Sequence, residues 1–103
     1  MTGNGFAARD KGAFTLSGRL TFQTVPQFLA HTDEWLQDGA ATVTIDLQGV
    51  TLADSAGLAL LLEWLQHARA AGREMVFTNI PDQVRDLVRV NGLTQVFGLT
   101  QDS

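Results

Sequence analysis

Two polar residues, Asp54 and Ser55, directly precede a leucine-rich segment, and their types and spacing are those of a helix start. Side-chain oxygens at such a position accept hydrogen bonds from the first backbone N–H groups of a helix, which no carbonyl within the helix can reach. Gly57 follows in the expected first turn, where its missing side chain lets another backbone or a partner's side chain approach closely. From spacing alone, the pattern is compatible with ordinary capping, worth about 1 kcal/mol, and with binding of a partner.

Groups suited to catalysis or metal binding are scarce in the rest of the chain. The two histidines, His31 and His67, fall in different predicted helices, and no cysteine or second histidine stands at ligand spacing from either. Ser17 and Ser55 lack an evident His–Asp partnership, and the glycines form neither of the common nucleotide-binding motifs. We therefore expect a protein that is not an enzyme and that holds no metal and no cofactor.

Strands and helices are predicted to alternate along the chain, because runs of β-branched residues alternate with apolar residues at helical spacing. The predicted order is a hairpin of 6–9 and 13–16, a helix over 24–36, a strand over 41–47, a turn over 48–53, a helix over 55–70, a strand over 75–78, a helix over 81–90, and an apolar segment over 93–99 that is a last strand or a covering turn. Thr24 and Gly39 bound the first helix, and Gly72 is the expected left-handed cap of the second. This order favours an α/β domain in which helices pack against a mostly parallel sheet, made mixed by the hairpin.

A helical wheel divides residues 55–70 into three faces. One face is the predicted core stripe, formed by Leu58, Leu61, Leu62 and Leu65, and the opposite face carries Glu63, His67 and Ala70. Leu60 and Trp64 fall on the flank between these faces, where a helix without a partner more often carries polar residues. This flank is predicted to form a docking ridge beside the helix start, although burial in the core is the ordinary role of a residue such as Trp64.

Length and charge restrict the class of protein. A chain of 103 residues, 45% of them hydrophobic, can bury one core, so we expect a single domain over 1–103 with its folded part at about 6–99. Seven basic against eleven acidic residues give a net charge of −4, and the basic residues are scattered, which disfavours nucleic acids and anionic lipid headgroups as ligands. The chain has no cysteine, no signal-peptide pattern in residues 1–10 and no apolar run long enough for membrane insertion, so we expect a cytoplasmic protein.

The segment from Ile45 to Leu62 resembles the signature of the STAS domain family. It has a strand ending in Ile-Asp-Leu, a spacer, and Asp-Ser-Ala-Gly-Leu at the start of a leucine-rich helix. The resemblance covers the chain from about Phe6 to Leu99 in the order and length of its elements. The family includes antagonists of anti-sigma factors, the cytoplasmic tails of sulfate transporters, and the small MlaB-type subunits of phospholipid ABC transporters. The resemblance implies a STAS-like fold for the whole chain.

Within this family, the run from Asp54 to Leu62 is most similar to the MlaB-type branch, whose helix opens with Asp-Thr-Ala-Gly-Leu-Ala-Leu-Leu-Leu. In phosphorylatable antagonists the motif resembles Asp-Ser-Ser-Gly, and the second serine takes the phosphate. Ala56 stands at that position here, so the resemblance implies that the usual phosphoryl switch is absent. Ser55 aligns with the threonine that the resemblance places in the contact with the transporter's ATPase. Phosphorylation of Ser55 itself is a second hypothesis, because a helix N-terminus attracts anions.

The function implied by the resemblance is that of a non-enzymatic subunit that binds the ATPase of a phospholipid ABC transporter and supports its assembly or activity. Such a transporter maintains the lipid asymmetry of the outer membrane, and the subunit would reach the inner membrane only through its partner. The expected contact comprises Asp54, Ser55, Ala56 and Gly57, with Leu60 and Trp64 flanking it. The alternative is an anti-sigma factor antagonist or a similar partner-switching regulator. A STAS domain that binds a small ligand or a nucleotide is a third class, because the same loop could cradle a phosphate.

Overall fold

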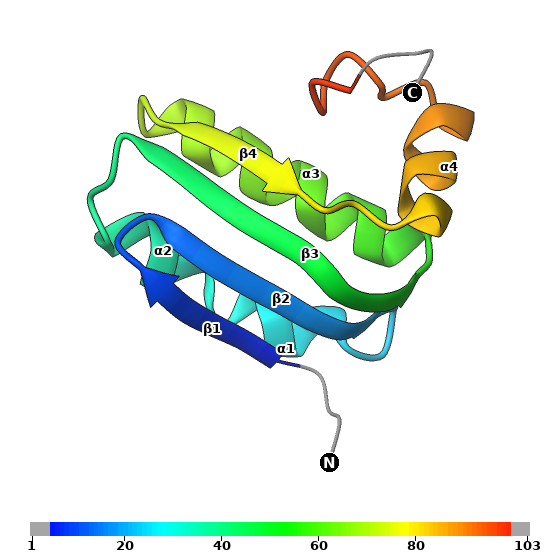
Figure 1. Ribbon diagram of the computed structural model, residues 1–103, viewed down its shortest axis with the longest axis horizontal. Coiled ribbons are helices and arrows are strands. Elements are labelled where there is room, and N and C mark those ends of the chain that lie inside the picture. The colour runs from blue at the N-terminus through cyan, green and yellow to red at the C-terminus, as the bar shows by residue number, and fades with distance from the viewer. Residues whose placement is uncertain (1–4, 100–103) are drawn as a thin grey trace.

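The sheet is built around β3 (Thr42–Ala53), which lies between β2 (Ala13–Leu20) and β4 (Glu74–Thr78). A computed structural model describes residues 5–99, and in it β1 (Gly5–Asp10) pairs with β2 at the edge of the sheet (Figure 1). The β1–β2 pair is antiparallel, and the β2–β3 and β3–β4 pairs are parallel. The predicted hairpin, the mostly parallel mixed sheet and the α/β class are therefore confirmed. The predicted domain bounds of 1–103 extend past the described residues at both ends.

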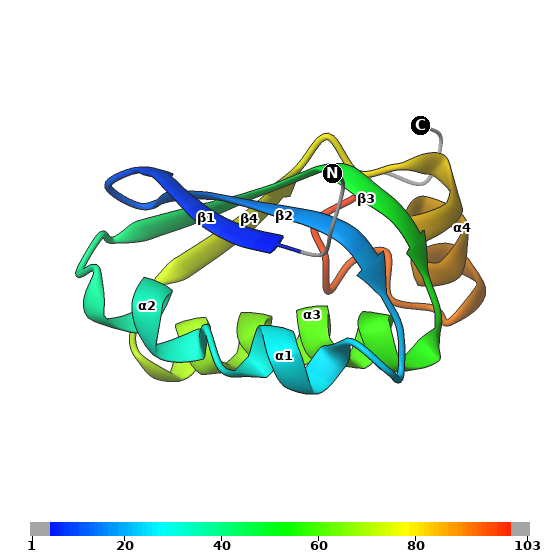
Figure 2. The same cartoon turned by 90° about the horizontal axis from the view of Figure 1, so that it is seen from below.

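Three helices cover one face of the sheet. They are α1 (Val25–Leu29), α2 (Thr32–Gln37) and α3 (Ser55–Ala70), and they lie together beneath the strands in Figure 2. A fourth helix, α4 (Asp82–Val90), packs against α3 and β3 at one end of the sheet. Within residues 5–99, no helix combines the length and the apolar character that crossing a membrane requires.

The core lies between the sheet and the three helices on its covered face. In the first part of β2 and of β3 alternate residues are buried, as the period of a half-covered strand requires, and the alternation ends where the pairing of the two strands becomes irregular. The largest fully buried side chains include Trp35, Trp64, Phe28, Leu16, Leu20, Ile45, Leu47 and Leu61. These residues come from α1, α2, α3 and the two central strands, so each helix on this face contributes to one continuous core.

A glycine follows each of the two longer helices, and the cap predicted at Gly72 is confirmed. Gly72 has a φ of +72°, and its N–H donates to the carbonyl of Arg69 at 3.0 Å. The N–H of Arg73 donates to the carbonyl of Ala68 at 2.9 Å. This pattern satisfies carbonyls that have no partner within the helix, and it recurs at Gly92 after α4, where φ is +70°.

The helix predicted over 24–36 is in fact two short helices, α1 and α2. Between them, the N–H of His31 donates to the carbonyl of Phe28 at 2.9 Å, three residues back rather than four. The Thr32 hydroxyl donates to the carbonyl of Leu29 at 2.7 Å and accepts from the indole N–H of Trp64 at 2.9 Å. Because Trp64 lies in α3, a tertiary contact holds the break, and the helical period of residues 24–36 does not reveal it.

The turn predicted over 48–53 is also wrong, since β3 continues to Ala53. The pairing of β2 with β3 shifts register between Thr15 and Ser17 and again between Gly18 and Arg19. A Cβ on Gly49 would lie 2.8 Å from the Cβ of Ser17, so this glycine permits a close approach of two strands rather than a turn. The turn-forming residue types of this segment therefore belong to an irregular strand that leads directly into α3.

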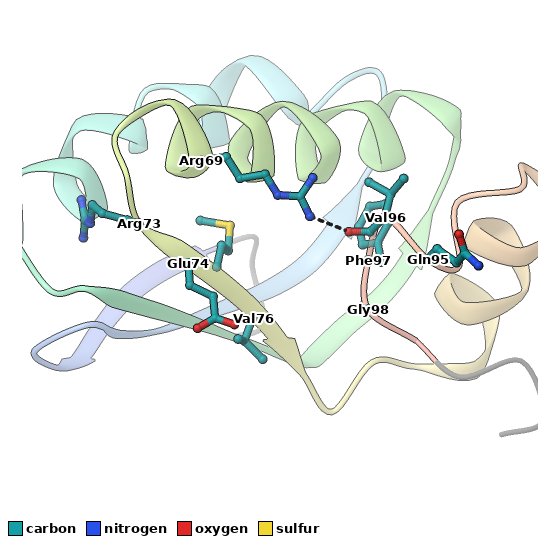
Figure 3. Close-up of a pocket in the computed structure, with 9 residues that line it drawn as sticks. Arg69, Arg73, Glu74, Val76, Gln95, Val96, Phe97 and Gly98 are labelled. Atoms are coloured by element: carbon teal, nitrogen blue, oxygen red, sulfur yellow. Dashed lines mark hydrogen bonds between the residues drawn. The ribbon is translucent and has the colours of Figure 1, made fainter.

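Residues 93–99 form a covering turn, one of the two predicted forms. The ring of Phe97 is buried and lies 5.6 Å, centroid to centroid, from that of Phe77 in β4. Arg69 holds this segment by donating from Nη2 to the carbonyl of Val96 at 3.1 Å (Figure 3). A hollow of about 440 Å³ is lined here by the last turn of α3, β4 and residues 95–98, and no residue of the predicted partner-binding site lines it.

Candidate partner-binding site

Asp54 is the N-cap of α3, as predicted, and its side chain also holds a second segment of the chain. Oδ1 accepts a hydrogen bond from the N–H of Gly57 at 3.0 Å, and Oδ2 accepts one from the N–H of Phe22 at 3.0 Å. The N–H of Asp54 donates to the carbonyl of Leu20 at 3.0 Å. One residue therefore fastens the loop between β2 and α1 to the first turn of α3. Ser55 is the first helical residue rather than the cap.

These hydrogen bonds lower the pKa of the Asp54 carboxyl below its ordinary value. The N–H of Phe22 contributes most, and the N–H groups at the start of α3 add to it, because all of them favour the ionised carboxylate. Partial burial opposes the shift without cancelling it. The pKa of Asp38 is lowered as well, chiefly by the backbone N–H of Gly12. The free energy of unfolding should therefore depend on the ionisation of both carboxylates.

We expect Asp54→Asn to destabilise the domain by about 1 to 2 kcal/mol at pH 7, because an amide cannot accept hydrogen bonds on both terminal atoms. A carboxyl whose pKa is lowered by folding stabilises the protein fully above its unfolded pKa and loses that effect as pH falls through its folded pKa. The difference between wild type and Asp54→Asn should therefore shrink below about pH 4. Urea unfolding at pH 7 and pH 3 measures it, and a difference that stays the same at both values would contradict the assignment.

The loop between β2 and α1 presents an aromatic residue that no sequence motif identifies as part of the site. Phe22 is 79% exposed, although its backbone N–H is bound by Asp54. Thr24 stiffens the same loop: its hydroxyl accepts from the N–H of Thr21 at 2.9 Å and donates to the carbonyl of Arg19 at 2.6 Å. The sequence indicates this residue only as an aromatic residue between polar ones in a predicted loop. Thr24 is the N-cap of α1, as predicted, but its hydroxyl serves the loop rather than the helix.

The first turn of α3 is accessible at some positions and covered at others. Ser55 is exposed, and Asp54 and Ala56 are half-buried, so the tip is open on the side that these residues occupy. Gly57 is buried, and a Cβ at this position would lie 2.1 Å from the carbonyl oxygen of Leu20. The close approach predicted at Gly57 is therefore made by the domain's own β2, and the prediction that Gly57 forms part of an open contact surface is wrong.

The docking ridge predicted at Leu60 and Trp64 is also wrong. Leu60 is 2% exposed and Trp64 is fully buried. The indole of Trp64 packs edge-on against the rings of Trp35 and Phe6, at centroid distances of 5.9 and 5.4 Å. Because α1 and α2 cover the flank of α3 while the sheet covers its adjacent face, the apolar arc of α3 is wider than a single core stripe. Of the predicted contact residues, Asp54, Ser55 and Ala56 retain accessible surface.

The described part of the chain offers little to a metal ion. Between residues 5 and 99, no group of three or more His, Asp or Glu side chains is arranged to hold one. The carboxylate of Asp54 is occupied by backbone N–H groups of the domain. What the tip offers instead is an exposed hydroxyl at Ser55 and an exposed phenyl ring at Phe22, whose backbone N–H is bound by the adjacent residue Asp54.

Several known proteins are similar to this chain in sequence or in fold. A family model described as "Mlab, STAS domain" matches residues 6–101. The anti-sigma-B factor antagonist of Staphylococcus aureus is 24% identical over 86 residues, which cover 84% of this chain and 80% of that protein. A putative anti-sigma factor antagonist from Thermotoga maritima superposes with a TM-score of 0.76 at 17% identity, over 93% of this chain and 84% of that one. A sulfate transporter family protein from Wolinella succinogenes superposes with a TM-score of 0.71 at 14% identity, over 88% of this chain and 75% of that one.

The strand order, the helices on one face of the sheet and the capped start of α3 define a single α/β domain of the STAS type. Because the family model spans almost all of the described chain, the protein belongs to the STAS domain family.

Proposed function

We propose that this protein is a non-enzymatic subunit that binds the ATPase of a phospholipid ABC transporter and supports the assembly or activity of that transporter. The contact is made by the accessible part of the α3 tip, at Asp54, Ser55 and Ala56. In this role the subunit works in the cytoplasm, reaches the inner membrane through its partner, and contributes to the lipid asymmetry of the outer membrane.

Ala56 is the observation that carries this proposal. It stands where the motif of phosphorylatable antagonists has the serine that takes the phosphate, and its methyl group offers no acceptor oxygen. A protein without that hydroxyl cannot be released from its partner by phosphorylation at this position, which fits a constitutive subunit. The family model described as "Mlab, STAS domain" supports the same choice.

We expect Ser55→Arg to abolish co-purification with the ATPase while leaving the fold nearly intact. Ser55 is exposed and is the first residue of α3, so a long cationic side chain can extend into solvent in the isolated domain. In the complex the same side chain would occupy the space of the partner and bring an uncompensated charge into the interface. Co-expression with the ATPase followed by affinity capture measures the effect, and thermal unfolding reports the fold.

The matched control is Gln66→Arg, which adds the same side chain to an exposed position of the same helix. This site is eleven residues away, about 16 Å along the axis at 1.5 Å per residue, so the variant should bind as wild type does. Normal capture of the ATPase by folded Ser55→Arg would rule out a contact at the tip. Failure of the wild-type protein to capture the ATPase at all would exclude the proposed partner.

The second candidate is an anti-sigma factor antagonist, and the relative from Staphylococcus aureus favours it. Under this function Ser55, the exposed hydroxyl at the tip, is the residue available for phosphorylation, and its place at the start of a 16-residue helix suits an anion. The same affinity capture distinguishes the two candidates. Capture of a kinase-type anti-sigma factor, together with an intact mass that shows a phosphate on the chain, would favour the antagonist.

A further inference from the structure

Phe22 is an exposed aromatic side chain on a loop whose backbone is held by hydrogen bonds. It is 79% exposed, and residues of this kind are normally buried. Its loop is nevertheless held at several points, by the Asp54 carboxylate on the N–H of Phe22 and by the Thr24 hydroxyl on the N–H of Thr21 and the carbonyl of Arg19. A loop fixed in this way presents the ring in one place. Little conformational entropy of the backbone then remains to be lost when a partner covers the ring.

The chain on both sides of this ring carries no charge. Residues 20–30, which include the loop and α1, contain no ionisable side chain, and neither do residues 55–62, the first two turns of α3. The two stretches meet in space where the backbone of Leu20 lies against Gly57. The centres of protein interfaces are depleted of charged residues and enriched in aromatic ones. The surface around Phe22 combines an exposed aromatic ring with two uncharged stretches, and the Asp54 carboxylate that accepts from the N–H of Phe22 is the charged group where they meet.

We propose that Phe22 is the anchor of the partner contact and that it inserts into an uncharged apolar pocket on the ATPase, beside the place where Ser55 makes its contact. This inference rests on the proposed function and adds to it the chemistry of the partner's surface. A protein pocket fits better than a phospholipid surface. The two charge-free stretches contain no lysine or arginine to bind phosphate groups, and the net charge of −4 repels anionic lipids.

The test measures the dissociation constant of the complex between the ATPase and the full chain by calorimetry. Phe22→Ser should weaken binding by at least about tenfold, because it removes the ring that fills the pocket. Phe22→Leu, which keeps an apolar side chain, should recover most of the affinity. The matched control is Val90→Ser, since Val90 is also 79% exposed but lies at the end of α4, outside both the loop and the first turns of α3. This control should bind as wild type does.

The outcomes distinguish failure of the Phe22 anchor from failure of the proposed function. If Phe22→Ser binds as wild type does while Ser55→Arg abolishes binding, the anchor is wrong and the proposed function stands. If the wild type does not bind the ATPase, the proposed function is wrong, and so is the role of Phe22 as an anchor. If wild type floats with vesicles of phosphatidylethanolamine and phosphatidylglycerol and Phe22→Ser does not, the ring contacts lipid and the protein pocket is refuted.

Discussion

Trp64→Ala should destabilise the domain by about 4 kcal/mol, a large share of the 5 to 15 kcal/mol that is typical of a domain. The indole is fully buried, packs against the rings of Trp35 and Phe6, and donates a hydrogen bond to Thr32. Removing it leaves a cavity where α2 and α3 meet the hairpin, and it deprives the break between α1 and α2 of a hydrogen bond. Urea unfolding monitored by circular dichroism measures the change.

Two further variants show which interactions of Trp64 account for the loss of stability. Trp64→Phe keeps a ring but not the N–H, so it should cost about 1 to 2 kcal/mol. Glu63→Ala changes the neighbouring exposed residue and should stay within about 0.5 kcal/mol of wild type. Should Trp64→Ala instead keep its full stability and lose only its partner, Trp64 would belong to the docking ridge that the helical wheel predicts, and its buried position would be refuted.

The elements with strong local signals could be predicted from the sequence. Residues 55–70 have a capping residue, a helical period and a following glycine, and all three features recur in α3. The break between α1 and α2 could not be predicted, because Trp64, more than thirty residues away, holds it. The continuation of β3 past Gly49 depends on its pairing with Ser17, which is likewise a contact between distant parts of the chain.

The site was predicted in part, for a related reason. Capping by Asp54 follows from local backbone geometry and could be predicted, whereas the second hydrogen bond of its carboxylate, to Phe22, needs the fold. The helical wheel placed Leu60 and Trp64 on a surface because it assumed that one layer covers the helix. In this fold the sheet and two short helices both cover α3, so a wider arc of the helix is buried. The number of covering layers is not a property of a single helix.

Gly57→Ala should destabilise the domain by about 3 kcal/mol, although alanine is a better helix former than glycine by up to about 1 kcal/mol. The added Cβ would lie 2.1 Å from the oxygen, 2.7 Å from the Cβ and 2.9 Å from the carbonyl carbon of Leu20. Two of these atoms belong to the backbone of β2, so no side-chain rotation relieves the clash. The start of α3 must move away from the strand, which also strains the hydrogen bond from the N–H of Asp54 to Leu20.

Gly72→Ala provides the matched control, because a Cβ at that position meets nothing within 4 Å and only the φ of +72° opposes it. It should cost about 1 kcal/mol, the usual penalty for a left-handed residue with a side chain. Denaturant unfolding of both variants compares a steric cost with a conformational one. If Gly57→Ala were as stable as wild type, β2 and α3 would not be in contact here. The tip that presents Ser55 and Phe22 together would then lack the support on which partner binding is proposed to depend.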